Sequence, residues 1–132
     1  MYGESTPQPN AKGKLLLVDD ELSVRKLLSQ ILTRSGYCVR CCAGGFSALS
    51  NLQHEVPDIL LSDLNMPGMS GFELLSVVRR RFPAIKTIAM SGAYSGDDMP
   101  PGVAADAFYG KGANLKALIQ ILDAMAAPSA HC

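Results

Sequence analysis

The fold of this chain is decided by residues 57–71, which read PDILLSDLNMPGMSG. The stretch opens with an apolar run, residues 59–61, that reaches the carboxylate of Asp63 and then passes into a Pro/Gly loop. A short continuous apolar run is typical of a strand that is buried on both faces. A carboxylate at the exit of such a strand is costly unless a ligand or partner uses it. Asp63 is therefore the first candidate functional residue.

Three other strand-like runs also end in polar groups. The residues concerned are Asp19 and Asp20 after residues 15–18, Ser91 after residues 87–90, and Lys111 after residues 107–109. If these strands are parallel, their carboxyl ends meet at one edge of the sheet. Three carboxylates, a hydroxyl and an ammonium would then lie together, and this set suits Mg²⁺ and a phosphoryl group.

Amphipathic helices are predicted between the strands. The residues expected on their apolar faces are Val24, Leu27, Leu28, Ile31 and Leu32; Phe46, Leu49 and Leu52; Leu74, Leu75, Val78 and Phe82; and Leu115, Leu118, Ile119, Leu122 and Met125. Gly36 is expected to cap the first helix, and Asn114 the last one. Ser70 and Glu73 form the spacing of a capping box ahead of the third helix. Residues 37–42 read as one more strand.

The alternation of strands and helices predicts an α/β fold, a doubly wound five-stranded parallel sheet of the flavodoxin-like type. In such sheets the ligand site lies outside the carboxyl ends of the strands, where all of the candidate residues fall. One segment departs from the pattern. Residues 92–105 should supply a fourth helix, but Pro100 and Pro101 lie between glycines. A short or irregular fourth helix is expected there.

Length and composition narrow the class of protein. The 132 residues fit one domain, which we expect at 14–126 between a flexible lead-in, 1–13, and a tail, 127–132. Twelve basic and twelve acidic residues cancel, which gives no argument for nucleic-acid binding. No apolar stretch is long enough for a membrane span, and no signal peptide is recognisable. Together with the lack of a disulfide framework, this indicates the cytoplasm.

The four cysteines offer a weaker signal. Cys38 and Cys41 form a lone CxxC, with Cys42 beside them and Cys132 in the tail. A zinc site needs two more ligands at a recognisable spacing, and the sequence does not supply them. Core or strand-surface positions are therefore favoured over metal or redox chemistry.

Each candidate residue has a simpler structural interpretation when it is taken alone. Asp20 could be the N-cap of the first helix, and Asp63 could begin an Asx turn into the Pro/Gly loop. Ser91 before a glycine is typical of a turn, and Lys111 between two glycines is typical of a solvated loop lysine. Their joint occurrence at four strand ends is what favours a shared site. There, the carboxylates could hold Mg²⁺ and one of them could act as a nucleophile toward phosphorus.

The motifs resemble the receiver domain of two-component response regulators. The resemblance rests on residues 15–21, LLLVDDE, together with residues 57–71, and residues 36–39 and 48–49 also fit. It covers about residues 14–126 and implies the following roles. Asp63 accepts a phosphoryl group from a histidine kinase or phosphotransfer protein. Asp19 and Asp20 hold Mg²⁺, and Asn65 adds its backbone carbonyl to the metal.

The resemblance also implies a switch, and hence a phosphorylation-dependent signalling protein rather than an enzyme. Ser91 takes the family's Thr/Ser position, Lys111 its lysine, and Phe108 the aromatic position that turns inward when Ser91 is recruited. One departure is Gly112, because the family usually has a proline after the lysine. The downstream protein, the kinase and homodimerisation are left open, as is whether the chain is part of a larger regulator.

Two rival functions remain at this point. A phosphorylation-independent protein-binding module would keep the fold without using the carboxylates, and weak Mg²⁺ binding would favour it. A hydrolase with an aspartyl-phosphate intermediate generally needs a second acid/base carboxylate close after the nucleophile. Position 65 is Asn, which argues against the hydrolase.

Overall fold

A computed structural model describes residues 11–92, 99–112 and 114–126 of the chain. In chain order the elements are β1 (Gly13–Val18), α1 (Leu22–Arg34), β2 (Tyr37–Cys42), α2 (Gly45–His54), β3 (Ile59–Asp63), α3 (Gly71–Arg81), β4 (Lys86–Ser91), β5 (Ala107–Gly110) and α4 (Leu115–Met125). All strand pairs are parallel, and the sheet order is β2-β1-β3-β4-β5. The predicted doubly wound five-stranded sheet is confirmed.

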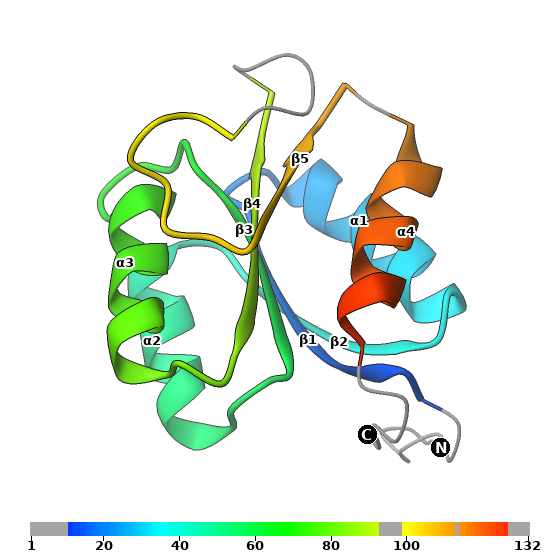
Figure 1. Cartoon of the computed structure of the whole chain (residues 1–132), viewed down its shortest axis with the longest axis horizontal. Helices are drawn as coiled ribbons and strands as arrows, with labels where there is room; N and C mark the ends of the chain where they lie inside the picture. Colours follow the sequence, from blue (N-terminus) through cyan, green and yellow to red (C-terminus); the bar gives the residue numbers. More distant parts are fainter. Residues whose placement is uncertain (1–10, 93–98, 113, 127–132) are drawn as a thin grey trace.

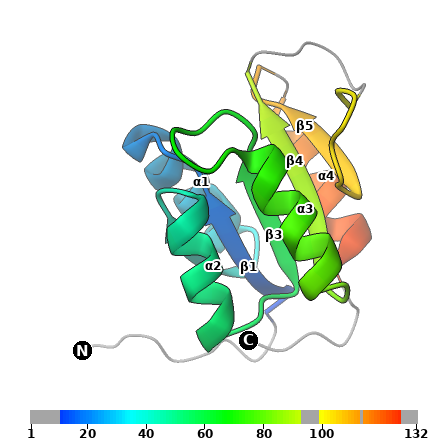
Figure 2. The same cartoon turned by 90° about the vertical axis from the view of Figure 1, so that its left-hand side faces the viewer.

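The helices cover both faces of the sheet (Figure 1). Helices α2 and α3 lie on one face, and α1 and α4 lie on the other. Figure 2, turned by 90°, shows α2 and α3 side by side in front of the strands. Each face has its own hydrophobic core, because alternate residues of every strand point to opposite faces. Leu16, Leu60 and Ala89 belong to the core under α2 and α3, whereas Leu15, Leu61 and Ile88 belong to the core under α1 and α4.

Local sequence signals explain where several helices begin and end. Ser70 and Glu73 form the expected capping box of α3, with Ser70 Oγ accepting from the Glu73 backbone N–H at 3.3 Å. The Asn114 side chain caps α4 by accepting from the Lys116 N–H at 2.8 Å. Gly36 follows the C-cap of α1 with φ of +107°, a conformation that favours glycine.

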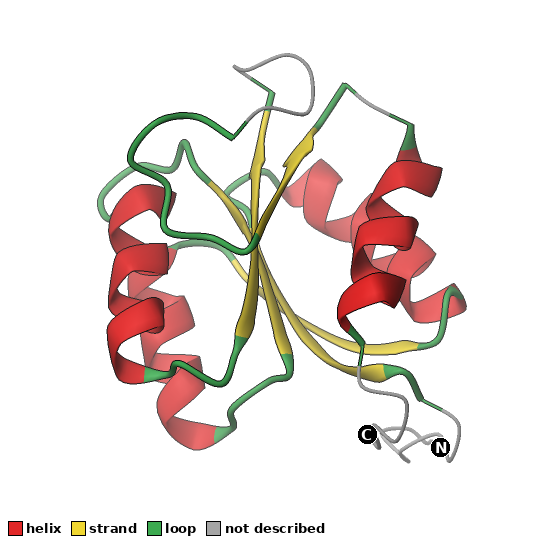
Figure 3. Cartoon of the chain, in the orientation of Figure 1, coloured by secondary structure: helices red, strands yellow, loops and turns green. Residues whose placement is uncertain are grey.

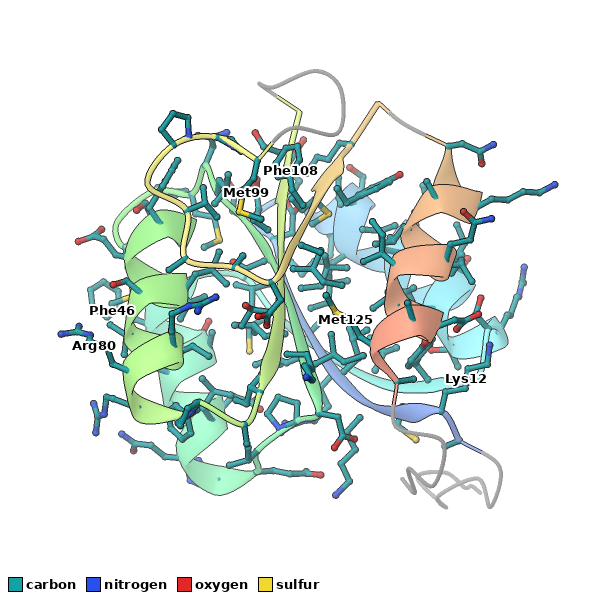
Figure 4. All side chains as sticks on the ribbon, in the orientation of Figure 1. Lys12, Phe46, Arg80, Met99, Phe108 and Met125 are labelled. Carbon is teal, nitrogen blue, oxygen red and sulfur yellow. The ribbon has the colours of Figure 1, made fainter. Side chains whose placement is uncertain are left out.

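Two residues expected on apolar helix faces are exposed instead. The exposed fraction of Leu27 is 54% and that of Phe46 is 69%. Only Leu28 and Leu32 of the α1 stripe are fully buried, since a single sheet face contacts a narrow arc of the helix. Phe46 lies in the first turn of α2, and in Figure 4 its label falls at the outer side of the layer formed by α2 and α3.

The described residues between β4 and β5 form no helix. Gly92 and residues 99–106 run as turns and extended chain, drawn as loop in Figure 3. Two adjacent prolines remove backbone donors and clash with a helical path, which explains the irregular course of residues 99–102. The rest of the expected fourth helix, residues 93–98, lies outside the described part of the chain. Among the described residues, no helix is both long and apolar enough to cross a membrane.

Candidate functional site

The sheet brings the predicted side chains to one edge. Register pairs Ser62 with Val18, Asp63 with Met90, and Ser91 with Gly110, so β1, β3, β4 and β5 end at nearly the same level. The carboxyl ends of these strands form the upper edge of the sheet in Figure 1. Every residue placed at a strand end by the sequence therefore lies at this edge.

Three aspartates form a compact acidic cluster there. One carboxylate oxygen from each of Asp19, Asp20 and Asp63 lies within 4.8 Å of the other two. Asp19 is fully buried and Asp63 is 3% exposed, whereas Asp20 is exposed. Like charges this close repel one another, so a bound or neighbouring cation is needed to stabilise all three in ionised form.

Lys111 provides a cation at this position. Its Nζ lies 2.9 Å from Asp19 Oδ2, 3.3 Å from Asp63 Oδ2 and 3.8 Å from a carboxylate oxygen of Glu21. Burial by itself would lower the pKa of Lys111, but the carboxylates of Asp19 and Asp63 outweigh it and raise this pKa. The lysine is therefore firmly protonated. It is the pairing partner of the buried carboxylates rather than a solvated loop residue.

Asp63 has an environment that suits a reactive carboxylate. Burial raises its pKa above the ordinary value, although the backbone N–H of Asn65 and the ammonium of Lys111 act against this rise. The Asn65 N–H donates to Asp63 Oδ1 at 3.3 Å. Asp63 therefore does begin an Asx-type turn, as its structural interpretation predicted, and it also faces the shared site.

Ser91 is buried and is held from two sides. Its Oγ accepts a hydrogen bond from the side-chain amide of Asn65 at 3.0 Å, and its carbonyl accepts from the Lys111 N–H at 3.0 Å. The sequence predicted a role for the Asn65 backbone carbonyl alone and missed this side-chain contact. Glu21 was missed too, although its position directly after the aspartate pair was a signal for it.

An open pocket of about 290 Å³ gives access to this cluster. It is lined by Asp20, Glu21, Asp63, Asn65, Gly92 and Lys111. Asp19 is buried and does not line this pocket. Its Oδ1 accepts from the Glu21 N–H at 2.9 Å. Its buried Oδ2 forms the ion pair with Lys111 and has no other partner among the described residues. Oxygen donors of this kind fit a hard divalent cation such as Mg²⁺.

Phe108 lies outside the pocket. It is 7% exposed and packs in the core under α2 and α3, on the strand next to the one that ends in Ser91. Figure 4 shows Phe108 close to Met99 near the same end of the sheet. Both residues line a surface groove of about 600 Å³ beside α4.

Two further contacts hold the backbone around the acidic cluster in place. The Arg25 guanidinium donates to the Asp19 carbonyl at 2.7 Å, which ties α1 to the end of β1. Gly71 packs against the backbone that follows β3, where an added Cβ would lie 2.0 Å from the Asp63 carbonyl oxygen. Neither residue was singled out from the sequence, because both act through backbone groups that only the fold brings near.

The start of α1 and the cysteines of β2 differ in detail from the expectations. The N-cap of α1 is Glu21 and not Asp20, and no side chain caps this helix. The Lys111–Gly112 peptide is trans, the ordinary form before a residue other than proline. Cys41 and Cys42 are free, whereas Cys38 is disulfide-bonded. Cys38 and Cys41 therefore do not form a disulfide with each other. The expected core or strand-surface position of Cys38 did not include a disulfide. Within the described residues, these cysteines join no metal-ligating cluster.

Comparison with known proteins identifies the family. The model of the response regulator receiver domain matches residues 15–123. The chain belongs to the response regulator receiver domain family. Proteins of this family are signalling domains of two-component systems. The predicted resemblance is thereby confirmed.

Individual relatives agree with this assignment. Sporulation initiation phosphotransferase F of Bacillus subtilis is 37% identical over 86 residues, which cover 65% of this chain and 68% of that protein. The DNA-binding transcriptional regulator NtrC of Proteus hauseri is 38% identical over 80 residues, which cover 61% of this chain. This match spans only 17% of the length of NtrC, so the activity of that whole regulator is not carried over.

Solved structures show the same fold. The response regulator TrrA of Thermotoga maritima, in complex with Mg²⁺-BeF, aligns with a TM-score of 0.78 and 29% identity over 85% of this chain and 97% of its own. TrrA is also known in complex with the histidine kinase ThkA. The chemotaxis response regulator CheY4 of Vibrio cholerae aligns with a TM-score of 0.74 and 30% identity, over 85% of this chain and 97% of CheY4.

Proposed function

We propose that this receiver domain is a phosphorylation-dependent signalling switch in which Asp63 accepts a phosphoryl group. The observation that carries the proposal is the Lys111 ammonium, which pairs with the buried carboxylates of Asp19 and Asp63 and lines an open pocket. Burying this many charges stabilises a fold poorly, so a use in chemistry accounts for them better than a structural role does.

The metal of the reaction would be Mg²⁺. The Asp19, Asp20 and Asp63 side chains and the Asn65 carbonyl would hold it, and the under-coordinated Oδ2 of Asp19 supports this assignment. When bound, Mg²⁺ supplies positive charge against the carboxylates and the phosphoryl oxygens. The resemblance to TrrA, which is known with Mg²⁺-BeF, supports the same choice of metal.

The chemical step is a phosphoryl transfer from a phosphohistidine. An ionised oxygen of Asp63 attacks phosphorus, a new O–P bond forms, and the N–P bond breaks with its electron pair moving to the imidazole nitrogen. Lys111 is already 3.3 Å from Asp63 Oδ2 and can offset charge on the transferred oxygens. Ser91 can donate its hydroxyl proton to one of them.

The phosphoryl group would then change a protein-binding surface. Nearly two negative charges are added at the sheet edge, and Ser91 and Lys111 are drawn toward them. Phe108, on the strand beside Ser91, repacks in response. Because Phe108 also lines the groove beside α4, this repacking alters the shape of that surface.

The phosphodonor on this proposal is a sensor histidine kinase or a phosphotransfer protein, and the reaction takes place in the cytoplasm. Support comes from TrrA, which is known in complex with the kinase ThkA and shares 30% identity with this chain in that comparison. The downstream partner is a further protein. Contact with nucleic acid is not assigned to this domain, whose charges cancel.

The test is intact-mass spectrometry after incubation with acetyl phosphate. The wild type should gain one phosphoryl group with Mg²⁺ and none with EDTA, and Asp63→Asn should gain none under either condition. Asp58→Asn is the matched control, since Asp58 is an exposed aspartate at the opposite end of β3. No gain by folded wild type from acetyl phosphate or from a histidine phosphodonor would instead favour a phosphorylation-independent binding module.

A further inference from the structure

Glu21 is a carboxylate of the open pocket to which the proposed function gives no role. Its side chain is 61% exposed and lines the pocket together with Asp20, Asp63 and Lys111. One of its oxygens lies 3.8 Å from Lys111 Nζ. The acidic cluster consists of Asp19, Asp20 and Asp63, and Glu21 is not a member of it. Glu21 therefore lies beside the expected metal ligands and not among them.

A contribution to stability explains little of this position. Glu21 is the N-cap residue of α1, but its side chain makes no capping hydrogen bond. The contact that it does make at the helix start uses its backbone N–H, which donates to Asp19 Oδ1 at 2.9 Å. An ion pair with an exposed member contributes little to stability, and a carboxylate near a helix N-terminus adds only a small favourable interaction. The side chain of Glu21 is thus available for a role in the pocket.

Lys111 does not offset the charge of Glu21. The ammonium lies closer to Asp19 and Asp63, at 2.9 and 3.3 Å, and both of these carboxylates are buried, where Coulombic attraction is stronger. This ammonium and one divalent cation together offset the three carboxylates of the acidic cluster. Among the described residues that line the pocket, Glu21 then contributes a negative charge that has no compensating cation.

Such a charge acts with opposite sign on the two species that enter the pocket. It attracts a divalent cation and repels an anionic phosphodonor. A small free donor such as acetyl phosphate carries about two negative charges at neutral pH and has few contacts with which to offset the repulsion. A phosphohistidine that is carried by a protein can offset it with binding energy from the rest of the interface.

We propose that Glu21 is a specificity-determining residue of the phosphoryl transfer. Its carboxylate keeps the cation-loaded pocket negative, which strengthens the binding of the divalent cation and makes small, free, dianionic phosphodonors poor substrates. The class of donor that this pocket favours is therefore a phosphohistidine on a docked protein. The inference deepens the proposed function and rests on it for the role of Asp63 as the acceptor.

The test compares wild type with Glu21→Gln at low ionic strength. Isothermal titration calorimetry gives the Kd for Mg²⁺, and intact-mass spectrometry gives the rate constant for phosphorylation by acetyl phosphate at saturating Mg²⁺. Both the Kd and the rate constant should rise about three-fold in Glu21→Gln, as Coulomb's law gives for charges several ångströms apart in a hydrated pocket. Both differences should shrink as KCl is added, because salt screens the charge.

Three comparisons separate the charge of Glu21 from its shape and from the net charge of the protein. Glu21→Asp keeps the carboxylate and should behave as the wild type does. Asp58→Asn removes one exposed carboxylate at the opposite end of β3, and it should leave the Kd and the rate constant unchanged. Phosphoramidate carries about one negative charge at neutral pH, so Glu21→Gln should accelerate its reaction less than that of acetyl phosphate.

The failure of this inference differs from the failure of the proposed function. Equal rate constants for wild type and Glu21→Gln with acetyl phosphate, or an unchanged Kd for Mg²⁺, would overturn the role of Glu21 alone. An acceleration that persists at high salt, or that Glu21→Asp shares, would also overturn it, because the effect would then come from shape. A folded wild type that neither acetyl phosphate nor a histidine phosphodonor phosphorylates would overturn the proposed function, and donor selection by Glu21 with it.

Discussion

Lys111 Nζ lies 2.9 Å from the buried Oδ2 of Asp19, so an ammonium that follows β5 neutralises a carboxylate that follows β1. The side chain of Asp19 is fully buried, and that of Lys111 is 21% exposed. The pair spans the edge of the sheet, because β3 and β4 lie between these strands. Lys111 therefore supplies a positive charge to the acidic cluster and links the end of β5 to the end of β1.

Lys111→Met should destabilise the protein when divalent cations are removed. Removal of the ammonium leaves buried Asp19 beside Asp63 without a compensating charge. We expect the free energy of unfolding to fall by about 2–3 kcal/mol. This is less than for a fully buried ion pair, because the pocket admits some water. Urea unfolding in EDTA measures this loss, with Lys116→Met as the control at an exposed lysine. Saturating Mg²⁺ should restore part of the stability of Lys111→Met. Equal stability of the two variants in EDTA would contradict the role given to the ion pair.

Asp63→Asn should stabilise the fold at neutral pH. Because burial raises the pKa of Asp63 above 3.8, the ionised form is disfavoured in the folded chain. Stability from such a group is fully present below the unfolded pKa and is lost as pH rises through the folded pKa. Asp63→Asn avoids that loss, so its melting temperature without divalent cations should exceed that of the wild type at neutral pH.

The same comparison at acidic pH supplies the control. The difference in melting temperature should shrink as the pH falls through the raised pKa of folded Asp63 and should vanish below its ordinary value of 3.8, where the carboxyl is protonated in both states. A difference that is constant with pH, or a less stable Asp63→Asn at neutral pH, would show that the charge of Asp63 is well compensated without a metal.

Gly71→Ala should displace the backbone that positions Asp63 in the acidic cluster. Its new Cβ would lie 2.0 Å from the Asp63 carbonyl oxygen and 2.6 Å from the Leu64 Cα, so the chain after β3 must move. Such overpacking against backbone costs about 3 kcal/mol, at the upper end of the usual range. Guanidinium unfolding should show this loss, together with weaker Mg²⁺ binding. Gly44→Ala is the control, because a Cβ at Gly44 would meet nothing within 4 Å.

The sequence predicted the strands and the site through signals that are local. Apolar runs that end in polar residues were sufficient to predict that Asp19, Asp63, Ser91 and Lys111 lie together. In a parallel sheet the carboxyl ends of the strands meet at one edge. The capping box of Ser70 was readable for the same reason, since its partner is three residues away. The residues that the structure gathers at this edge were therefore predictable from the sequence, and their chemical roles stay a prediction.

Contacts between distant segments were not predictable. Leu27 and Phe46 fit helical stripes, yet the width of each stripe that is buried depends on what packs against the helix. The Asn65–Ser91 hydrogen bond joins residues 26 apart and depends on the side-chain geometry of two loops. The proposed N-cap role of Asp20 was wrong because α1 begins one residue later than that interpretation needs.

The role of Asp63 as phosphoacceptor is tested by locating the residue that becomes modified. Wild type is treated with acetyl phosphate and Mg²⁺ and then reduced with borohydride, which converts an acyl phosphate to an alcohol. Tandem mass spectrometry of the peptides then reads the position. Homoserine is expected at residue 63 and at no other aspartate or glutamate. Homoserine at Asp19, Asp20 or another carboxylate, with Asp63 unchanged, would contradict the assignment of Asp63 as the phosphoacceptor.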